Sequence, residues 1–268
     1  MRIAAFQRHA IFDNMGHVCD VLERDLCWAA NEGSEIALFP ESFLLGHSYD
    51  PQVIAARADR LANGGLEMLC SRLTWADPTV IVGAFAQRGN VVTNSAFVIE
   101  HGCVIGHYAK AYPNEPGVVA GTEYPVFQRS GLCYGINICN DANQPTAARR
   151  LADQRTSLIL YPLNNMLPPE TAAQWRNRSI DTLQARARQT GCWVASADVT
   201  GGHGQSMSYG CTVIVSPDGT IVSRAREGRE DVAVTSCRRS QARDGVVQTK
   251  ERLRNTLERL DDDRLPLV

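Results

Sequence analysis

One stretch constrains the fold of this chain more than any other: an apolar run that ends in a cysteine and is followed by polar residues. Residues 132–139 read Leu-Cys-Tyr-Gly-Ile-Asn-Ile-Cys, and the pair Asn-Asp follows. This pattern predicts a buried strand with Cys139 at its tip and a helix over residues 144–154. Parallel α/β sheets place ligands and reactive groups at such strand ends, because backbone N–H groups point outward there. Cys139 is therefore positioned to react.

A second interpretation of Cys139 is packing, because a free cysteine is usually buried as a small hydrophobic residue. The chain has nine cysteines and no C-x-x-C pair, which fits neither a disulfide framework nor a zinc ribbon. We therefore expect reduced thiols and no metal site. A reactive thiol needs a polar, electropositive environment, so the partners of Cys139 distinguish the two interpretations.

The remaining pattern predicts a mixed α/β fold. Strands are expected over residues 2–7, 35–39, 79–86, 91–100, 103–108, 126–129, 157–161, 192–197, 209–215, 220–224 and 231–237. Helices are expected over residues 14–31, 51–75 with a break near residues 63–65, 170–189, and from about residue 246. Because βα units are mixed with hairpins, we expect a mixed sheet doubled into two layers with helices outside. Apolar runs are evenly spread, which favours a single domain over residues 1–268.

Composition excludes several classes of protein. Hydrophobic residues make up 44% of the chain and charged residues 21%, which is typical of globular proteins. A formal net charge of -2 gives no electrostatic reason to expect nucleic acid or an anionic membrane as partner. No apolar run approaches the ~20 residues of a membrane helix, and residues 1–7 lack the features of a secretory signal. We expect a cytoplasmic protein that acts on a small soluble molecule.

Two more polar residues directly follow predicted strands. Glu41 comes after the strand at residues 35–39, and Lys110 comes after the strand at residues 103–108. Strand ends at one edge of a sheet converge, so these side chains are expected to meet Cys139. A thiol nucleophile needs a base, and an ammonium stabilises an oxyanion, so the three groups suffice for acyl transfer. Each residue alone has an ordinary structural explanation.

These residues resemble the three motifs of the nitrilase superfamily of carbon-nitrogen hydrolases. The motifs are a Pro-Glu after the second strand, a lysine after a meander, and a cysteine followed by Asp in a strand-to-helix turn. Here they read Leu-Phe-Pro-Glu-Ser-Phe at 38–43, Gly-His-Tyr-Ala-Lys at 106–110 and Gly-Ile-Asn-Ile-Cys-Asn-Asp at 135–141. The similarity continues through residues 184–187 and 209–212 to residues 216–219. It implies a four-layer αββα sandwich, no cofactor, and a homodimer or higher homo-oligomer.

The resemblance also implies roles for the residues. Glu41 would be the general base, Lys110 the stabiliser of the oxyanion and Cys139 the nucleophile. Glu115, in the loop after the lysine, matches a second glutamate that supports the site in this family. The expected reaction is hydrolysis of a small amide through a thioester, with the backbone N–H of Asn140 as a further oxyanion donor.

Differences from the family motifs after the cysteine limit the classes of substrate that we expect. Members that act on nitriles commonly carry Trp-Glu after the cysteine, whereas residues 140–141 are Asn-Asp. We therefore expect amide or carbamoyl hydrolysis. N-carbamoyl-D-amino acid amidohydrolases continue with two arginines that hold the substrate carboxylate, whereas residues 142–143 are Ala-Asn. The loss of this bidentate clamp argues against a carbamoyl amino acid as substrate, although Arg149 or Arg176 could take the role of the missing pair.

Five residues are expected to border the substrate. The loop at residues 163–169 follows the strand after the cysteine, and the expected set is Asn140, Asn164, Asn165, Tyr49 and Trp175. For the last two, packing of an aromatic ring is an equally good explanation.

Several other functions remain open at this point. A papain-like hydrolase would use a histidine as base, and His203 is the one in an obvious loop after the cysteine. A serine hydrolase is disfavoured, because no G-x-S-x-G motif is present, and zinc chemistry lacks a spaced His/Cys cluster. A scaffold could bind an amide without turning it over, and an ammonia-supplying partner of a synthetase would need a docking surface or a fused domain.

Overall fold

The computed structural model describes residues 1–238, and Met1–Cys237 form one compact unit. The helix expected from about residue 246 lies outside the described residues, so a single domain over residues 1–268 stays a prediction. Within the described part, no helix is both long and apolar enough to cross a membrane.

One sheet has eight strands in the order β11-β10-β1-β2-β3-β4-β5, and β14 also pairs with β1. β1, β2 and β3 are parallel, whereas β3, β4 and β5 form the antiparallel meander expected from the sequence. The strands are β1 (Arg2–His9), β2 (Ile36–Leu38), β3 (Thr79–Arg88), β4 (Val91–Glu100), β5 (Cys103–Ala109), β10 (Val199–His203), β11 (Ser206–Ser208) and β14 (Asp231–Ser236).

The other sheet has six strands in the order β13-β12-β9-β8-β7-β6. β7, β8 and β9 run parallel, so their carboxyl ends open at the same edge. The strands are β6 (Val126–Arg129), β7 (Leu132–Ile136), β8 (Leu158–Pro162), β9 (Trp193–Ala197), β12 (Val213–Val215) and β13 (Ile221–Arg224).

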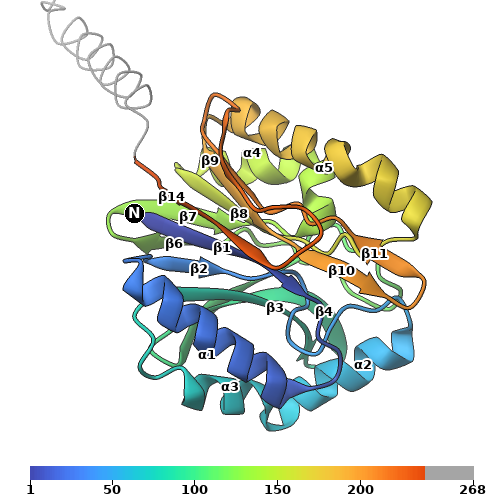
Figure 1. The fold of residues 1–268 in the computed structure, drawn as a ribbon. Coiled ribbons are helices and arrows are strands. Elements are labelled where there is room, and N and C mark those ends of the chain that lie inside the picture. Colours follow the sequence, from blue (N-terminus) through green and yellow to red (C-terminus); the bar gives the residue numbers. More distant parts are fainter. Residues whose placement is uncertain (239–268) are drawn as a thin grey trace, which may run out of the picture. The chain divides into compact units, whose positions relative to one another are not determined.

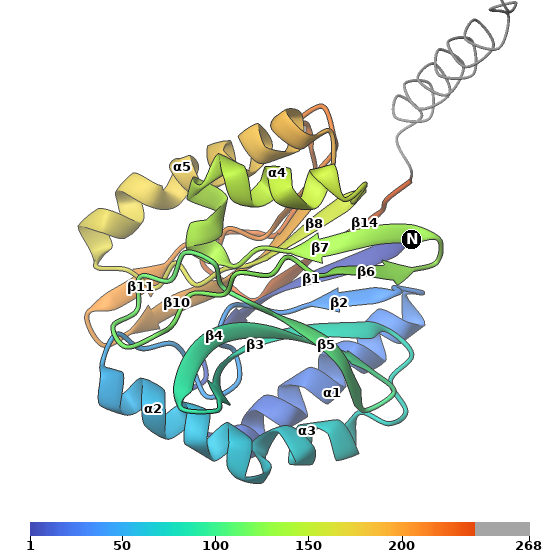
Figure 2. The ribbon, with the colours of Figure 1, turned by 180° about the vertical axis from the view of Figure 1, so that it is seen from behind.

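Helices cover the outer face of each sheet, which gives the expected four layers (Figure 1, and from behind Figure 2). The first sheet is covered by α1 (Met15–Asn31), α2 (Pro51–Arg60) and α3 (Leu66–Arg72), and the second by α4 (Pro145–Asp153) and α5 (Pro169–Thr190). Apolar side chains fill the space between the sheets, with Ile36 and Ile81 from the first and Ile136 and Leu160 from the second. The predicted four-layer αββα sandwich is confirmed.

Local signals explain where the helices begin and end. The side chain of Asn14 accepts a hydrogen bond from the backbone of His17 and caps α1. Gly191 ends α5 in the left-handed conformation, with φ of 61°. The expected break between α2 and α3 is present, because Asn63 and Gly64 depart from helical angles inside a short π-helical segment, Leu61–Gly65.

The sequence prediction was wrong at three places near the edge of the sheets. β7 ends at Ile136, so Cys139 is not at a strand tip but begins a 3-10 turn, Cys139–Asn143. β10 and β11 were not expected, because the glycine-rich residues 200–204 read as a loop. Residues 209–212 form no strand, because the backbone N–H groups of Gly210 and Cys211 donate to the side chains of Ser208 and Asp198.

Candidate active site

Lys110 lies between two buried carboxylates. Its Nζ is 2.7 Å from Oε1 of Glu41 and 2.7 Å from Oε1 of Glu115. Lys110 directly follows β5, Glu41 lies in the loop after β2, and Glu115 lies in the loop after Lys110. The exposed fraction is 1% for both Glu41 and Lys110. The structure thus brings together three of the four residues that the sequence assigned to catalysis.

Two further side chains hold the carboxylates, and the sequence did not point to either role. Nδ2 of Asn94 donates to Oε1 of Glu41 at 2.8 Å and to Oε1 of Glu115 at 2.9 Å. Nε2 of His47 lies 2.9 Å from the same oxygen of Glu115. An asparagine inside the apolar strand β4 is the signal that could have identified Asn94, because a buried polar side chain requires partners.

The charges of this cluster reinforce one another. Burial favours the neutral amine of Lys110, but the charges of Glu41 and Glu115 outweigh it and raise the pKa of Lys110. Burial would raise the pKa of Glu115, but hydrogen bonds from His47 and Lys110 hold that pKa well below its ordinary value. Lys110 is therefore an ammonium and Glu115 a carboxylate at neutral pH.

Cys139 has an unusual backbone and a protonated thiol. Its φ is 41°, in the left-handed region that residues with a side chain rarely adopt. Burial and then the charge of Glu41 raise the pKa of the thiol well above its ordinary value, whereas Lys110 and the backbone N–H of Asn164 oppose the shift. The thiol therefore needs a base to become a nucleophile.

Asp141 holds the turn that presents Cys139. Its buried carboxylate accepts hydrogen bonds from the backbone of Ile138 at 2.8 Å, the backbone of Tyr112 at 2.9 Å and the hydroxyl of Tyr108 at 2.8 Å. Burial raises the pKa of Asp141 to about 6, and these hydrogen bonds limit the rise. The turn after β7 is thus joined to β5 and to the loop that carries Glu115.

The expected substrate-lining residues occupy different places. A cavity beside the thiol is lined by Cys139, Ala142, Asn143, Leu163, Asn165, Trp175, Ser179, Thr182 and Leu183. Asn165 and Trp175 belong to this wall. Asn164 also contacts the site, because its Nδ2 lies 3.4 Å from the backbone oxygen of Glu41. The side chain of Asn140 instead donates to the backbone oxygen of Tyr112 at 3.0 Å.

Tyr49 lies on the other side of the cluster, near the lysine. Its hydroxyl accepts a hydrogen bond from Nδ2 of Asn114 at 3.3 Å, and Oδ1 of Asn114 is 3.4 Å from Nζ of Lys110. Partial burial and the charges of Glu41 and Glu115 raise the pKa of Tyr49 to about 12. Tyr49 therefore carries its proton at neutral pH and can donate a hydrogen bond.

The residues that the alternative functions would require lie outside the cavity beside Cys139. Arg176 forms an ion pair with Glu227 and lies over the ring of Tyr209, and Arg149 is exposed on α4. The ring of His203 stacks on Phe12, with centroids 4.0 Å apart. None of the three lines the cavity beside Cys139.

A metal ion has little room in the acidic cluster. Among the described residues, one group of side chains could together bind a metal ion. The donor atoms of Glu41, His47 and Glu115 lie within 4.8 Å of one another. Both Oε1 atoms already accept hydrogen bonds from Lys110 and Asn94. The ammonium of Lys110 thus supplies the positive charge that a cation would bring.

Comparison with known proteins identifies relatives over most of the chain. A nitrilase from Pyrococcus abyssi is 26% identical over 215 residues, which cover 77% of this chain and 78% of that protein. A deaminated glutathione amidase from Bos taurus is 26% identical over 224 residues, covering 75% and 66% of the two chains.

Solved structures share this fold at low sequence identity. An amidase from Nesterenkonia has a TM-score of 0.78 and 23% identity, over 88% of this chain and 90% of that one. A glutamine-dependent NAD+ synthetase from Acinetobacter baumannii has a TM-score of 0.78 and 19% identity, over 87% of this chain and 44% of its own. The family model for carbon-nitrogen hydrolases matches residues 3–245. The chain therefore belongs to the carbon-nitrogen hydrolase family and is an enzyme that hydrolyses carbon-nitrogen bonds.

Proposed function

We propose that this enzyme hydrolyses a small, uncharged amide through a thioester on Cys139. Glu41 acts as general base and acid, Lys110 stabilises the oxyanion, and Glu115 holds Lys110 in place. One observation carries the assignment: Oε2 of Glu41 is buried and has no hydrogen-bond partner among residues 1–238, although Oε1 of the same carboxylate binds both Lys110 and Asn94. A buried, unpaired carboxylate oxygen beside a protonated thiol supports its role as the base.

The first half of the reaction forms the thioester. Oε2 of Glu41 accepts the thiol proton as the sulfur of Cys139 bonds to the amide carbon, and the carbonyl π electrons move to oxygen. Lys110 has three N–H donors, of which two are used by carboxylates at 2.7 Å and the third reaches Asn114 only at 3.4 Å. That third donor is available to the oxyanion, together with the backbone N–H of Asn140.

The second half releases both products. Glu41 transfers its proton to the amide nitrogen, the carbon–nitrogen bond breaks, and the oxyanion collapses to a thioester. Glu41 then takes a proton from water as the water oxygen attacks the thioester. When the second oxyanion collapses, the carbon–sulfur bond breaks, the thiolate recovers the proton from Glu41, and the acid leaves.

The wall of the cavity supports an uncharged substrate. It consists of apolar and neutral polar side chains around Cys139, without a charged one. Solved structures of the Nesterenkonia amidase include complexes with butyramide and with acrylamide, and one with the acetamide moiety of fluoroacetamide added covalently at the active-site cysteine. Small linear amides are therefore the first compounds to test.

The alternatives have less support. A carbamoyl amino acid would need a cation for its carboxylate, and Arg176 is already paired with Glu227. A papain-like base is disfavoured, because His203 stacks on Phe12 outside the cavity. A binding scaffold has no need of a nucleophile held in a left-handed backbone conformation, as Cys139 is.

The test combines product analysis with intact mass. The enzyme is incubated with acetamide, propionamide and butyramide, and ammonia release and protein mass after acid quench are recorded. We expect ammonia and an acyl adduct with the wild type, neither with Cys139→Ala, and at most trace ammonia with Glu41→Gln. Cys103→Ala is the matched control, since that exposed thiol lies on β5. Undiminished ammonia release by Cys139→Ala would overturn the proposal.

Assembly and location are separate proposals. We propose that the enzyme forms a homodimer or higher homo-oligomer, which sedimentation of the purified protein tests, and a monomer at micromolar concentration would contradict it. The cytoplasmic location stays a prediction, tested by fractionation of cells that express the full chain.

A further inference from the structure

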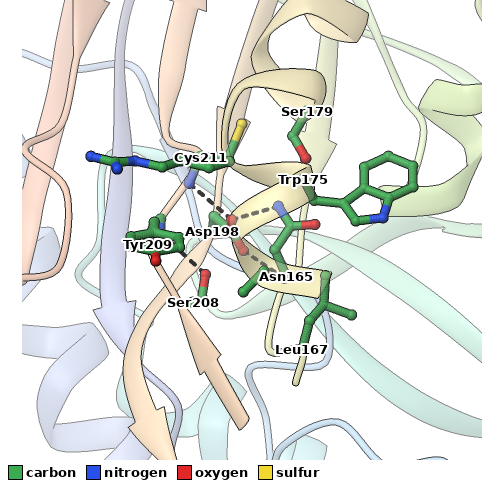
Figure 3. Close-up of a pocket in the computed structure, with 11 residues that line it drawn as sticks. Asn165, Leu167, Trp175, Ser179, Asp198, Ser208, Tyr209 and Cys211 are labelled. Carbon is green, nitrogen blue, oxygen red and sulfur yellow. Dashed lines mark hydrogen bonds between the residues drawn. The ribbon is translucent and has the colours of Figure 1, made fainter. Parts of the chain in front are cut away.

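Asp198 is a fully buried carboxylate that the proposed reaction does not use. It lies between β9 and β10 and accepts hydrogen bonds from the backbone N–H of Asn165 at 3.0 Å, Nδ2 of Asn165 at 2.7 Å and the backbone N–H of Cys211 at 2.9 Å (Figure 3). Burial raises the pKa of Asp198 to about 6, and the N–H donors oppose the rise. Asp198 is therefore ionised at neutral pH.

An ionised carboxylate fixes the orientation of the Asn165 side chain. A carboxylate only accepts hydrogen bonds, so Nδ2 of Asn165 must face Asp198 and Oδ1 must face the opposite way. Figure 3 shows this oxygen directed away from Asp198, on the side of Trp175. Within residues 1–238, Oδ1 of Asn165 accepts no hydrogen bond. The hydrogen bond to Asp198 thus leaves Oδ1 of Asn165 as an unused acceptor that points away from Asp198.

The acceptor lies in the wall beside the nucleophile. Asn165, Trp175 and Ser179 line both the cavity that contains Cys139 and the adjoining pocket of Figure 3. The other walls beside the thiol include the apolar side chains of Leu163 and Leu183. In a wall without charged side chains, an acceptor with a fixed orientation favours ligands that carry a donor over ligands that lack one.

The position of the cavity wall that contains Asn165 indicates whether the acyl half or the amine half of the substrate contacts it. Glu41, which protonates the leaving amine, comes from a loop of the first sheet, after β2. The cavity wall comes from the second sheet, with Leu163 and Asn165 after β8 and Trp175 on α5. The leaving amine therefore faces Glu41, and the acyl half that stays on Cys139 faces Asn165.

We propose that Asn165, oriented by Asp198, is a specificity-determining residue whose Oδ1 accepts a hydrogen bond from the acyl half of the substrate. The preferred substrates are then uncharged amides with a hydroxyl or N–H donor on the acyl chain. Asp198 is a positioning residue, because it acts through Asn165. This inference rests on the amide hydrolysis proposed above and adds the chemistry of the acyl group.

Three amides with the same number of non-hydrogen atoms test the inference. Butyramide has an apolar end, methoxyacetamide carries an acceptor only, and 3-hydroxypropanamide carries a donor. We expect wild-type kcat/KM for 3-hydroxypropanamide to exceed the values for both others by about three- to tenfold, the size of one neutral hydrogen bond. The preference should lie mainly in KM, because the contact is made in the bound substrate as well as in the transition state.

Variants of Asn165 and Asp198 test whether these two residues cause the preference for a donor on the acyl chain. Asn165→Leu removes the acceptor and should abolish the preference while butyramide is still hydrolysed. Asp198→Asn allows the Asn165 amide to turn and should reduce the preference, and the double variant should match Asn165→Leu alone. Melting temperatures are recorded beside the kinetics, and Asn165→Leu decides the question if Asp198→Asn does not fold.

The outcomes separate this inference from the proposed function. Ammonia released at equal kcat/KM from all three amides would overturn the role of Asn165 and leave the thioester mechanism standing. A preference retained by Asn165→Leu would also overturn it. If the wild type releases no ammonia from any of the three and forms no adduct on Cys139, both proposals fail.

Discussion

Nζ of Lys110 binds one oxygen of Glu41 and leaves the other free. The bonded atom, Oε1, is 2.7 Å from Nζ, whereas Oε2 is buried and has no hydrogen-bond partner in the part of the chain that the structure describes. Oε1 thus holds the lysine, and Oε2 is the oxygen to which the proposed mechanism transfers the proton of Cys139. This division depends on Asn94, which donates to the same Oε1.

Replacement of Lys110 by methionine should cost both activity and stability. The oxyanion loses a charged donor, so kcat should fall by at least about 100-fold. Glu41 and Glu115 would face each other in a buried site without a cation, which costs about 3–5 kcal/mol of unfolding free energy. Steady-state kinetics and urea unfolding measure the two effects. Adding Glu115→Gln should recover part of the stability and none of the activity, and recovered activity would argue against an oxyanion role.

Replacement of Asn94 by leucine tests the clamp on the two carboxylates. Both Oε1 atoms lose a donor in a buried site, so we expect a loss of about 1–3 kcal/mol in unfolding free energy. The kcat should fall by about tenfold, the size of one lost hydrogen bond, because the carboxylate of Glu41 loses one of the two donors that fix its orientation. Thr93→Val is the control, since Thr93 is buried on the same strand and donates to Ala86 instead. Equal kcat for Asn94→Leu and the wild type would contradict the clamp.

Alkylation of Cys139 by iodoacetamide should follow the charges around the thiol. The pKa of Cys139 is raised by burial and by Glu41 and is lowered by Lys110. Glu41→Gln should therefore move the pH midpoint of alkylation down, and Lys110→Met should move it up. Mass spectrometry of the peptide that contains Cys139 gives the rate at each pH. Shifts in the opposite directions would show that neither charge acts on the thiol as described.

Asp141 should give the unfolding free energy a pH dependence between about pH 4 and 6. Burial raises the pKa of its carboxyl to about 6, whereas an unfolded chain titrates near about 3.9. Between these values the folded state binds more protons than the unfolded state, so stability falls as pH rises, by about 2–3 kcal/mol in total. Urea unfolding of Asp141→Asn should lack this contribution. Asp77→Asn, at an exposed site, should keep the wild-type slope, and a wild-type slope in Asp141→Asn would refute the assignment.

Much of the fold was predictable because its signals are local. Apolar alternation placed most strands, Asn14 and Gly191 marked helix ends, and the poor helix propensity of residues 63–65 located the break between α2 and α3. Local signals failed where pairing is decided by distant partners. β10 forms because Val199 and Thr200 pair with the distant strand β1, and Gly201 and Gly202 continue the strand by pairing with β11.

The sequence alone determined which groups are candidates for the chemistry, because Glu41, Lys110 and Cys139 each follow a recognisable apolar strand within a few residues. The tertiary structure decided how those groups are held. Asn94 lies 53 residues from Glu41 along the chain, and Asp198 lies 33 residues from Asn165. Glu41 follows β2 and Asn94 lies on β4, both in the first sheet, and Asn165 and Asp198 follow two neighbouring strands of the second sheet. Their hydrogen bonds therefore arise only when strands distant in the sequence are brought together and buried, since burial then forces each polar side chain to find a partner. The free oxygen of Glu41 and the orientation of Asn165 are consequences of that packing.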